Sequence, residues 1–101
     1  MLIKITCFDD NRSYQKIVNA EPVVIKGFEI FKFAVHKTTF IRGIAWEEGY
    51  GYSVTELSTG LSIRSGITPK QAIENTELFL SEKGKHRTLL QILKYQHHET
   101  A

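Results

Sequence analysis

The side chains best suited to chemistry in this sequence are its histidines, and we first ask whether they could hold a metal ion. They are His36, His86, His97 and His98. Adjacent histidines on a helix point about 100° apart, so His97 and His98 are poorly placed to share one ion. No cysteine or further histidine lies at a recognised ligand spacing from this pair. We therefore expect an exposed C-terminal end there and no metal site.

Two pairs of adjacent acids, Asp9–Asp10 and Glu47–Glu48, could supply carboxylates for acid–base catalysis or for a metal. Both pairs lie where the sequence is typical of a turn, and acids in turns mostly hydrogen-bond to nearby backbone. Cys7 lies in an apolar segment without an activating motif, which predicts a buried structural thiol rather than a nucleophile. Because no set of polar groups predicts a pocket, we expect no enzyme activity and no cofactor.

A group of basic residues near the C-terminus could contact phosphate: Lys83, Lys85, Arg87 and Lys94. The first three surround Gly84, which we predict to end a helix, and cations there offset the helix dipole without any ligand. Over the whole chain, 13 basic and 11 acidic side chains give a formal charge of +2 and are well mixed. This lacks the one-sided charge of most nucleic-acid-binding proteins, so nucleic-acid binding is kept as the alternative function.

Length and composition predict one globular domain over residues 1–101, since 42% of the residues are hydrophobic and 24% are charged. A single cysteine excludes an internal disulfide. No apolar run approaches the roughly 20 residues of a membrane span. Residues 1–20 do not resemble a signal peptide. We therefore expect a cytoplasmic protein without a membrane partner.

The elements that would position these residues begin with a β-rich N-terminal half. Residues 2–8 and 13–18 predict two short strands, separated by a turn at residues 9–11. The strongest β segment is residues 22–37, and its stretch 28–35 is apolar on both faces. A strand of this kind is usually central in a sheet, or covered on both sides.

The next predicted feature is a hairpin around Thr59 and Gly60, after an extended segment at residues 40–46 and a turn at residues 47–49. A two-residue loop places four apolar residues on one face: Tyr52, Val54, Leu61 and Ile63. A three-residue loop instead sets Ser62 and Arg64 beside the first two of them. Register follows the apolar pattern, so we predict the two-residue loop.

A helix is predicted to begin after Thr68, whose hydroxyl can accept an otherwise unpaired backbone N–H. Pro69 suits the first helical position, Gln71 can complete a capping box, and Gly84 provides the C-terminal stop. The apolar stripe of this helix contains Ala72, Ile73, Thr76, Phe79 and Leu80. Its spacing predicts an amphipathic helix that packs on a sheet.

Leu78 lies off that stripe, and the nearest element able to cover it is a final helix predicted at residues 88–96. Its apolar surface is formed by Leu89, Leu90, Ile92 and Leu93. Two helices are not expected to cover both apolar faces of the 28–35 stretch. We therefore predict an interaction surface at Phe28, Ile30 and Leu78, to which a protein partner or a second copy of the chain binds.

Residues 46–83 resemble the N-terminal domain of HicB-type antitoxins. The resemblance rests on GYGYSV at residues 49–54, Gly60, and GITPKQAIEN at residues 66–75. That family shares a strand, a turn, a second strand, then Gly, Thr and an alanine-containing helix start. The Pro-Gly pair of its proline-rich turn is replaced here by residues 56–60. The resemblance implies a HicB-like antitoxin as a further alternative.

Residues 27–80 resemble small uncharacterised open reading frames of phages and prophages, on FAVHK at residues 33–37, VTE at 54–56 and TGL at 59–61. This implies a mobile-element origin and no mechanism. The order of strands and helix also looks like the core of a double-stranded-RNA-binding domain. The N-terminal helix of that family has no counterpart, and its lysine cluster is reduced to Lys70, so its function is not carried over.

Together these patterns predict an α+β fold with an antiparallel sheet of about four to five strands and two C-terminal helices. The predicted function is that of a phage- or prophage-type small protein that acts by binding, as a protein-interaction or regulatory module, and that could form a homodimer. The alternatives are a nucleic-acid-binding accessory protein and a HicB-like antitoxin.

Overall fold

Six strands are followed by two helices in the computed structural model, which describes residues 1–9, 12–43 and 45–100, with side chains except at residues 9 and 96–100. The strands are β1 (Leu2–Asp9), β2 (Arg12–Asn19), β3 (Glu21–Val23), β4 (Phe33–Arg42), β5 (Ala45–Glu56) and β6 (Leu61–Gly66). The helices are α1 (Pro69–Lys83) and α2 (Lys85–Thr100). The predicted α+β class and its two C-terminal helices are confirmed.

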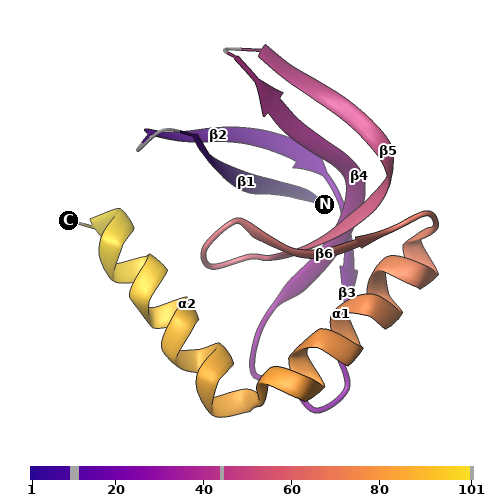
Figure 1. The fold of residues 1–101 in the computed structure, drawn as a ribbon, viewed down its shortest axis with the longest axis vertical. Coiled ribbons are helices and arrows are strands. Elements are labelled where there is room, and N and C mark those ends of the chain that lie inside the picture. Colours follow the sequence, from indigo (N-terminus) through magenta and orange to yellow (C-terminus); the bar gives the residue numbers. More distant parts are fainter. Residues whose placement is uncertain (10–11, 44, 101) are drawn as a thin grey trace.

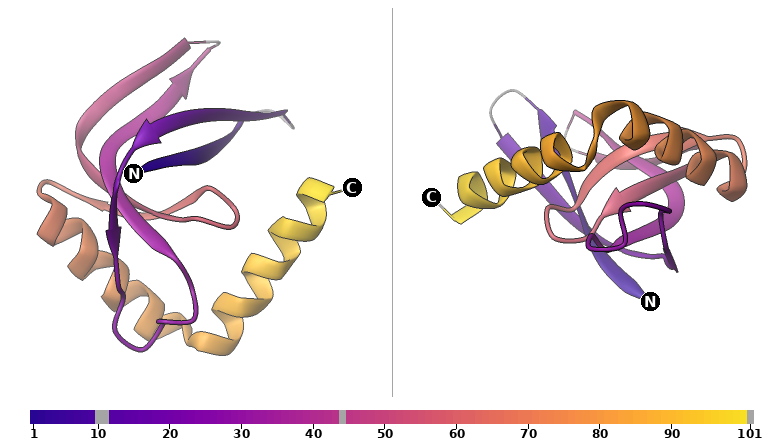
Figure 2. Two further views of the ribbon diagram at one scale, coloured as in Figure 1. Left: turned by 180° about the vertical axis from the view of Figure 1, so that it is seen from behind. Right: turned by 90° about the horizontal axis from the view of Figure 1, so that it is seen from below.

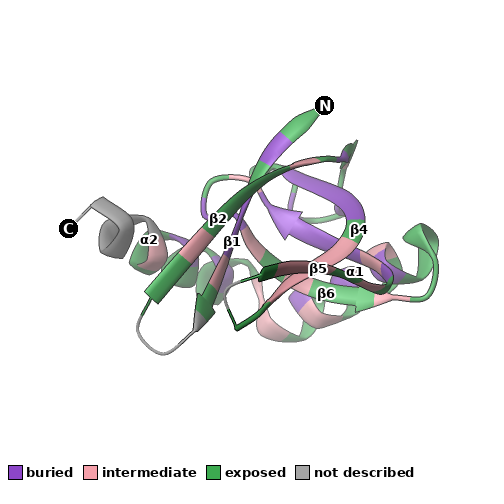
Figure 3. Ribbon diagram, turned by 90° about the horizontal axis from the view of Figure 1, so that it is seen from above, coloured by how far each residue is buried: buried purple, intermediate pink, exposed green. Residues whose placement is uncertain are grey.

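The strands form two antiparallel sheets, which with α1 make three layers (Figure 1). β1 pairs with β2 as a separate hairpin, and the larger sheet has the order β3-β4-β5-β6. The first residues of β4, Phe33 to His36, are buried, whereas β2 is largely exposed (Figure 3). β4 is therefore the central element, with α1 on one face and the β1–β2 hairpin on the other.

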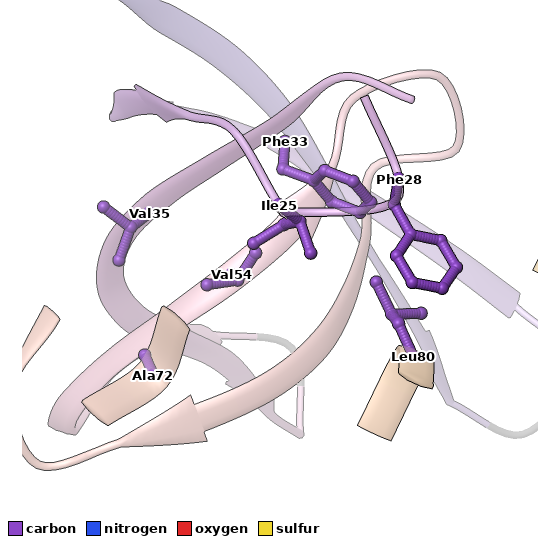
Figure 4. Close-up of a cluster of buried hydrophobic side chains, with 7 residues drawn as sticks. All are labelled: Ile25, Phe28, Phe33, Val35, Val54, Ala72 and Leu80. Carbon is purple, nitrogen blue, oxygen red and sulfur yellow. The ribbon is translucent and has the colours of Figure 1, made fainter. Parts of the chain in front are cut away.

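The main core lies between the larger sheet and α1 (Figure 4). Its buried members are Ile25, Phe28, Phe33, Val35, Val54, Ala72 and Leu80. Ile25 and Phe28 come from residues 24–32, a connection with turns that folds over the end of this cluster. Phe28 is only 5% exposed, so its place in the predicted interaction surface is wrong: folding already removes its ring from water.

A second cluster covers the other face of β4 and joins Ile3, Ile5, Ala20 and Ala34. The first three come from the N-terminal hairpin and the residue that follows it. Both faces of β4 are thus covered by other parts of the same chain. The second apolar face gives no support to a homodimer, because β1 and β2 bury it.

Two strand predictions are wrong in their boundaries. Residues 22–37 are not one strand, because the chain turns at residues 24–32 between β3 and β4. The predicted turn at residues 47–49 lies inside β5, and the chain reverses near Gly43, whose φ is 65°. Gly49 instead allows the Phe40 ring to pack closely, since an added Cβ would lie 3.2 Å from it. The turn predicted at residues 9–11 falls mainly outside the described residues.

The β5–β6 connection has four residues, not the predicted two. A buried carboxylate fixes this turn: Glu56 accepts hydrogen bonds from the backbone N–H of Ser58 at 2.8 Å and of Thr59 at 3.0 Å. Val54 is paired with Arg64, which the three-residue alternative had placed beside it. A bulge at Ile63 lets this residue pack on the same core as Val54.

The predicted start and end of α1 are confirmed. The hydroxyl of Thr68 accepts a hydrogen bond from the Gln71 N–H at 3.1 Å. Gln71 Oε1 in turn accepts from the N–H of Ile67 at 2.9 Å, one residue before the expected capping-box partner. Gly84 ends the helix, and its N–H donates to Leu80 O at 2.8 Å. The predicted stripe faces the core, with Ala72, Thr76 and Leu80 buried.

The second helix begins at Lys85, three residues before its predicted start. Figures 1 and 2 show that α1 and α2 form a V, with α1 along the sheet and α2 directed away from α1. α2 does not cover Leu78, which is 62% exposed, so that prediction is wrong. In the described part of the chain, neither helix is long and apolar enough to span a membrane.

Candidate binding groove

A hollow on the described surface lies between α2, the end of α1 and the β5–β6 hairpin, and has a volume of about 260 Å³. Apolar side chains from four elements dominate its lining: Phe33, Leu61, Ile63, Phe79, Leu80 and Ile92. Ligand pockets for small molecules are generally larger, at roughly 300–1,000 Å³. The groove is therefore suited to one or two amino-acid side chains.

The walls of the groove follow from the way the two helices are joined. Gly84 alone separates them, with φ 89° and ψ 152°, a backbone region that side-chain-bearing residues rarely adopt. From this joint α2 runs toward the N-terminal hairpin, where the Tyr95 and Phe8 rings lie 6.0 Å apart. The joint thus lies at one end of the groove, and Tyr95, which also lines the groove, contacts the N-terminal hairpin.

A cationic group lies at the rim of the groove. The Arg64 guanidinium carbon is 3.6 Å from the centre of the Phe79 ring, and the Lys83 ammonium is 5.5 Å from the same ring. Such contacts hold a cation over an aromatic face. The one ion pair among the described residues joins Arg42 and Glu47, so Arg64 and Lys83 have no carboxylate at ion-pairing distance there.

Glu56 is the one carboxylate among the lining residues, and it is occupied by its own turn. Besides the two backbone N–H groups, the hydroxyls of Ser58 and Thr59 donate to it at 2.7 and 2.9 Å. Glu56 was not among the predicted functional residues, although an acid shortly before Ser, Thr and Gly is a recognisable turn pattern. Glu56 shapes the groove and does not neutralise its rim.

The four predicted phosphate-binding residues do not form one patch at the groove. Lys83 lies in the last turn of α1 and lines the groove. Lys85 and Arg87 lie in the first turn of α2, and Lys94 lies farther along it; all three are exposed. The prediction that a helix C-terminus explains them holds for Lys83 alone. Lys85 and Arg87 instead face the positive end of the α2 dipole, which disfavours cations.

The segment before β4 lies close to the start of α2. The pKa of the exposed Glu29 carboxyl is lowered, mainly by the N–H of Gly27, which donates to it at 3.0 Å, and by its own N–H. The charge of Lys85 contributes more weakly in the same direction. Ile30, predicted as an interaction residue, is 64% exposed in this segment. Leu78 is exposed elsewhere, on α1, and isolated apolar residues of this kind are common on surfaces.

A histidine–threonine pair lies on the opposite face of the sheet and resembles a base and a nucleophile. His36 Nδ1 is 2.7 Å from the carbonyl oxygen of Lys37, and Nε2 is 2.6 Å from Thr55 Oγ1. Because a carbonyl only accepts, Nδ1 carries the proton and the Thr55 hydroxyl donates to Nε2. Burial lowers the pKa of His36. Thr55 is only 1% exposed, so no substrate reaches this pair and it stabilises the sheet.

The structure also bears on the candidate metal ligands and on the thiol of Cys7. Among the described residues, no cluster of three or more His, Cys, Asp or Glu side chains could hold a metal. The side chains of His97 and His98 lie outside the described part. Cys7 is half-buried, and burial raises the pKa of its thiol, which makes it a poor nucleophile at neutral pH.

A wider hollow of about 340 Å³ lies between β2 and the β4–β5 hairpin. Trp46 lines it, together with charges of both signs from Lys16, Lys37, Glu47 and Glu48. Glu47 lies 3.5 Å from Arg42, and the mixture of charges favours no single kind of ligand. The groove beside α2 is therefore the better candidate site.

Comparison of the chain with known proteins finds no family model, no curated protein and no solved structure that matches it. The resemblances to HicB-type antitoxins and to phage open reading frames thus stay predictions. The site itself defines only a class: a groove with an apolar floor and a cationic rim.

Proposed function

We propose that this protein is a non-catalytic binding module that holds a segment of a partner protein in the groove between α2 and the β5–β6 hairpin. One observation carries the proposal: α2, the end of α1 and the β5–β6 hairpin leave an open groove lined largely by apolar side chains. Among the α2 residues whose side chains are described, 85–95, Thr88 and Ile92 are buried. A groove lined by apolar side chains and bounded by a helix is a common way to hold a peptide.

The polar groups around the groove support a binding role over a catalytic one. Glu56 accepts only from its own turn, and His36 and Thr55 are bonded to each other on the other face of the sheet. No other acid with a described side chain lines the groove. Neither Glu56 nor the His36–Thr55 pair is thus positioned to transfer a proton to a molecule in the groove. The resemblance to phage open reading frames and HicB-type domains favours a regulatory role for such a module.

The test is selection of short peptides from a random display library on the full chain, followed by titration against two matched variants. Gln91→Trp places a bulky ring at an exposed position that lines the groove. Leu90→Trp adds the same ring at the next residue, which is exposed and does not line the groove. We expect the first variant to weaken binding about tenfold or more and the second to change it by less than about twofold.

Two outcomes contradict the proposal. One is a library that yields no peptide with saturable binding. The other is a set of peptides that bind the Gln91→Trp variant as tightly as the unchanged chain. Circular dichroism of both variants confirms that they fold, which both should, because the substituted side chains are exposed.

Nucleic-acid binding is a second candidate, favoured by one specific observation. Lys85 and Arg87 occupy the first turn of α2, where they cost helix stability instead of adding to it. A ligand with phosphate groups would account for their presence. A mobility-shift titration at low salt tests this, with Lys85→Gln and Arg87→Gln combined as the variant. Binding that weakens in the variant and with added salt supports the candidate, and no shift discards it.

A further inference from the structure

Resting on the proposed binding role of the groove, we infer that its occupant is an acidic segment of a partner protein. A bulky apolar side chain of this segment enters the groove, and a neighbouring aspartate or glutamate pairs with Arg64.

The stacking of Arg64 on Phe79 leaves its guanidinium ready to receive a carboxylate. A separation of 3.6 Å between Cζ and the ring centre places the ring against the flat face of the guanidinium. The N–H donors lie in its plane, and the hydrogen bond found for them goes from one Nη to the Ile63 carbonyl at 2.8 Å. The other in-plane donors can pair with both oxygens of one carboxylate, and the stack has already fixed the side chain.

Apart from Glu56, the charged side chains that line the groove are basic: Arg64 and Lys83. Lys83 shares the Phe79 ring with Arg64, and residues 83–98 contain no aspartate or glutamate. Glu56 below the rim has its oxygens taken by Ser58 and Thr59. An acidic segment is thus complementary to this surface. A second copy of the chain would bring two basic α2 helices toward each other unless another part of it entered the groove.

The apolar floor favours a protein segment over a nucleic acid. Leu61, Ile63 and Ile92 line the groove and offer few polar groups to a sugar or a base edge. An apolar side chain buried at the centre of an interface, with charged pairs at its rim, is the usual arrangement of a protein hot spot. The volume of about 260 Å³ suits one such anchor.

The test uses two designed, fluorescently labelled peptides and measures fluorescence anisotropy with the full chain. The first has a central Leu-Phe pair flanked by aspartates, and its twin has asparagine in place of each aspartate. We expect saturable binding of the acidic peptide and binding about tenfold or more weaker for its twin. Added salt should weaken the acidic peptide more than the twin.

Arg64→Gln is the decisive variant, and Arg42→Gln is its matched control. Arg42 is also exposed and also lies near an aromatic ring, at 5.8 Å from Phe40, but it belongs to the β4–β5 hairpin. We expect Arg64→Gln to weaken the acidic peptide about tenfold and Arg42→Gln to leave it within about twofold. Arg64→Lys, which keeps the charge and loses the planar fork, should fall between them.

The outcomes separate the two proposals. If the acidic peptide and its twin bind equally, or if Arg64→Gln has no effect, the inference about the partner is wrong. The groove still stands as the binding site in that case, provided that Gln91→Trp abolishes binding. If Gln91→Trp has no effect either, the proposed function fails as well. Light scattering could instead detect a dimer that the peptide dissociates, or RNA could displace the bound peptide. Either result would assign the groove to another occupant and overturn the inference.

Discussion

The two helices have nearly the same length, 15 and 16 residues, yet the fold uses them differently. α1 buries Ala72, Thr76 and Leu80 against the sheet. α2 has more leucines, but Leu89, Leu90 and Leu93 remain exposed and it buries mainly Ile92. Since burial of apolar area is the main source of stability, α1 belongs to the folding core. Those three leucines lie outside the groove, which α2 lines with Thr88, Gln91, Ile92 and Tyr95. α2 thus contributes less to the core than α1 and forms one wall of the open groove.

The comparison predicts, first, that core substitutions in the two helices differ widely in effect. Leu80→Ala should lower the free energy of unfolding by about 2–5 kcal/mol, because it opens a cavity against Phe28 and Phe33. Ile92→Ala should lower it by less than roughly half of that amount, because Ile92 lies outside the main core cluster that contains Leu80. Urea denaturation followed by Trp46 fluorescence measures both.

Leu78→Ala is the control for this pair, since it removes the same side chain from the exposed side of α1. It should change the free energy of unfolding by less than about 0.5 kcal/mol. If Ile92→Ala lowers the free energy of unfolding as much as Leu80→Ala, α2 is part of the core and the two helices do not differ in this way.

The second prediction concerns the joint that keeps the helices apart. Gly84 has φ 89° and ψ 152°, and an added Cβ would meet no atom within 4 Å. Gly84→Ala should therefore cost about 1–3 kcal/mol through backbone strain alone. Alanine also favours a continuous helix, which would swing α2 away from the sheet. Small-angle X-ray scattering should then give a larger radius of gyration, and a variant that keeps both its dimensions and its stability would contradict the assigned role of Gly84.

The third prediction tests whether the packed part can be weakened without involving α2. Burial lowers the pKa of His36 below the ordinary value of 6.5, so the unfolded chain binds this proton more readily. The resulting stability is fully present above about pH 6.5 and decreases as the pH falls toward the pKa of the folded state, by at most about 1.4 kcal/mol per pH unit.

His36→Gln should remove this part of the pH dependence, measured as urea midpoints between neutral and mildly acidic pH. Hydrogen exchange should show the acid-induced loss of protection in β4, β5 and α1. If the pH dependence is unchanged in the variant, another group is responsible for it.

Local patterns allowed much of the fold to be predicted. The caps at Thr68 and Gly84 involve residues a few positions apart, so the beginning and end of α1 can be predicted from nearby residues. The two N-terminal strands were predicted from their β-rich composition, but their pairing as a separate hairpin was not. The burial of Phe28 and the turn near Gly43 were not predicted, because both depend on residues that are distant in the sequence.

The candidate site was predicted only in part. Lys83 was singled out for its charge, and it does lie at the groove. Arg64 and Phe79 were not recognised as a pair, because one lies on β6 and the other on α1, and the bulge at Ile63 sets their register. The length of the β5–β6 loop was predicted wrongly. The apolar pattern gave no sign that the Glu56 carboxylate would be buried and hydrogen-bonded within its own turn.

The sequence alone determined the α+β class, the start of α1 at Pro69 and its end at Gly84, since capping and periodicity act over a few residues. Only the tertiary structure decided that β1 and β2 cover the second face of β4, and that α2 stands apart to leave a groove. These features depend on which of several apolar surfaces meet. Many pairings of similar apolar area are open to the chain, and the shapes and hydrogen bonds of distant residues select one of them.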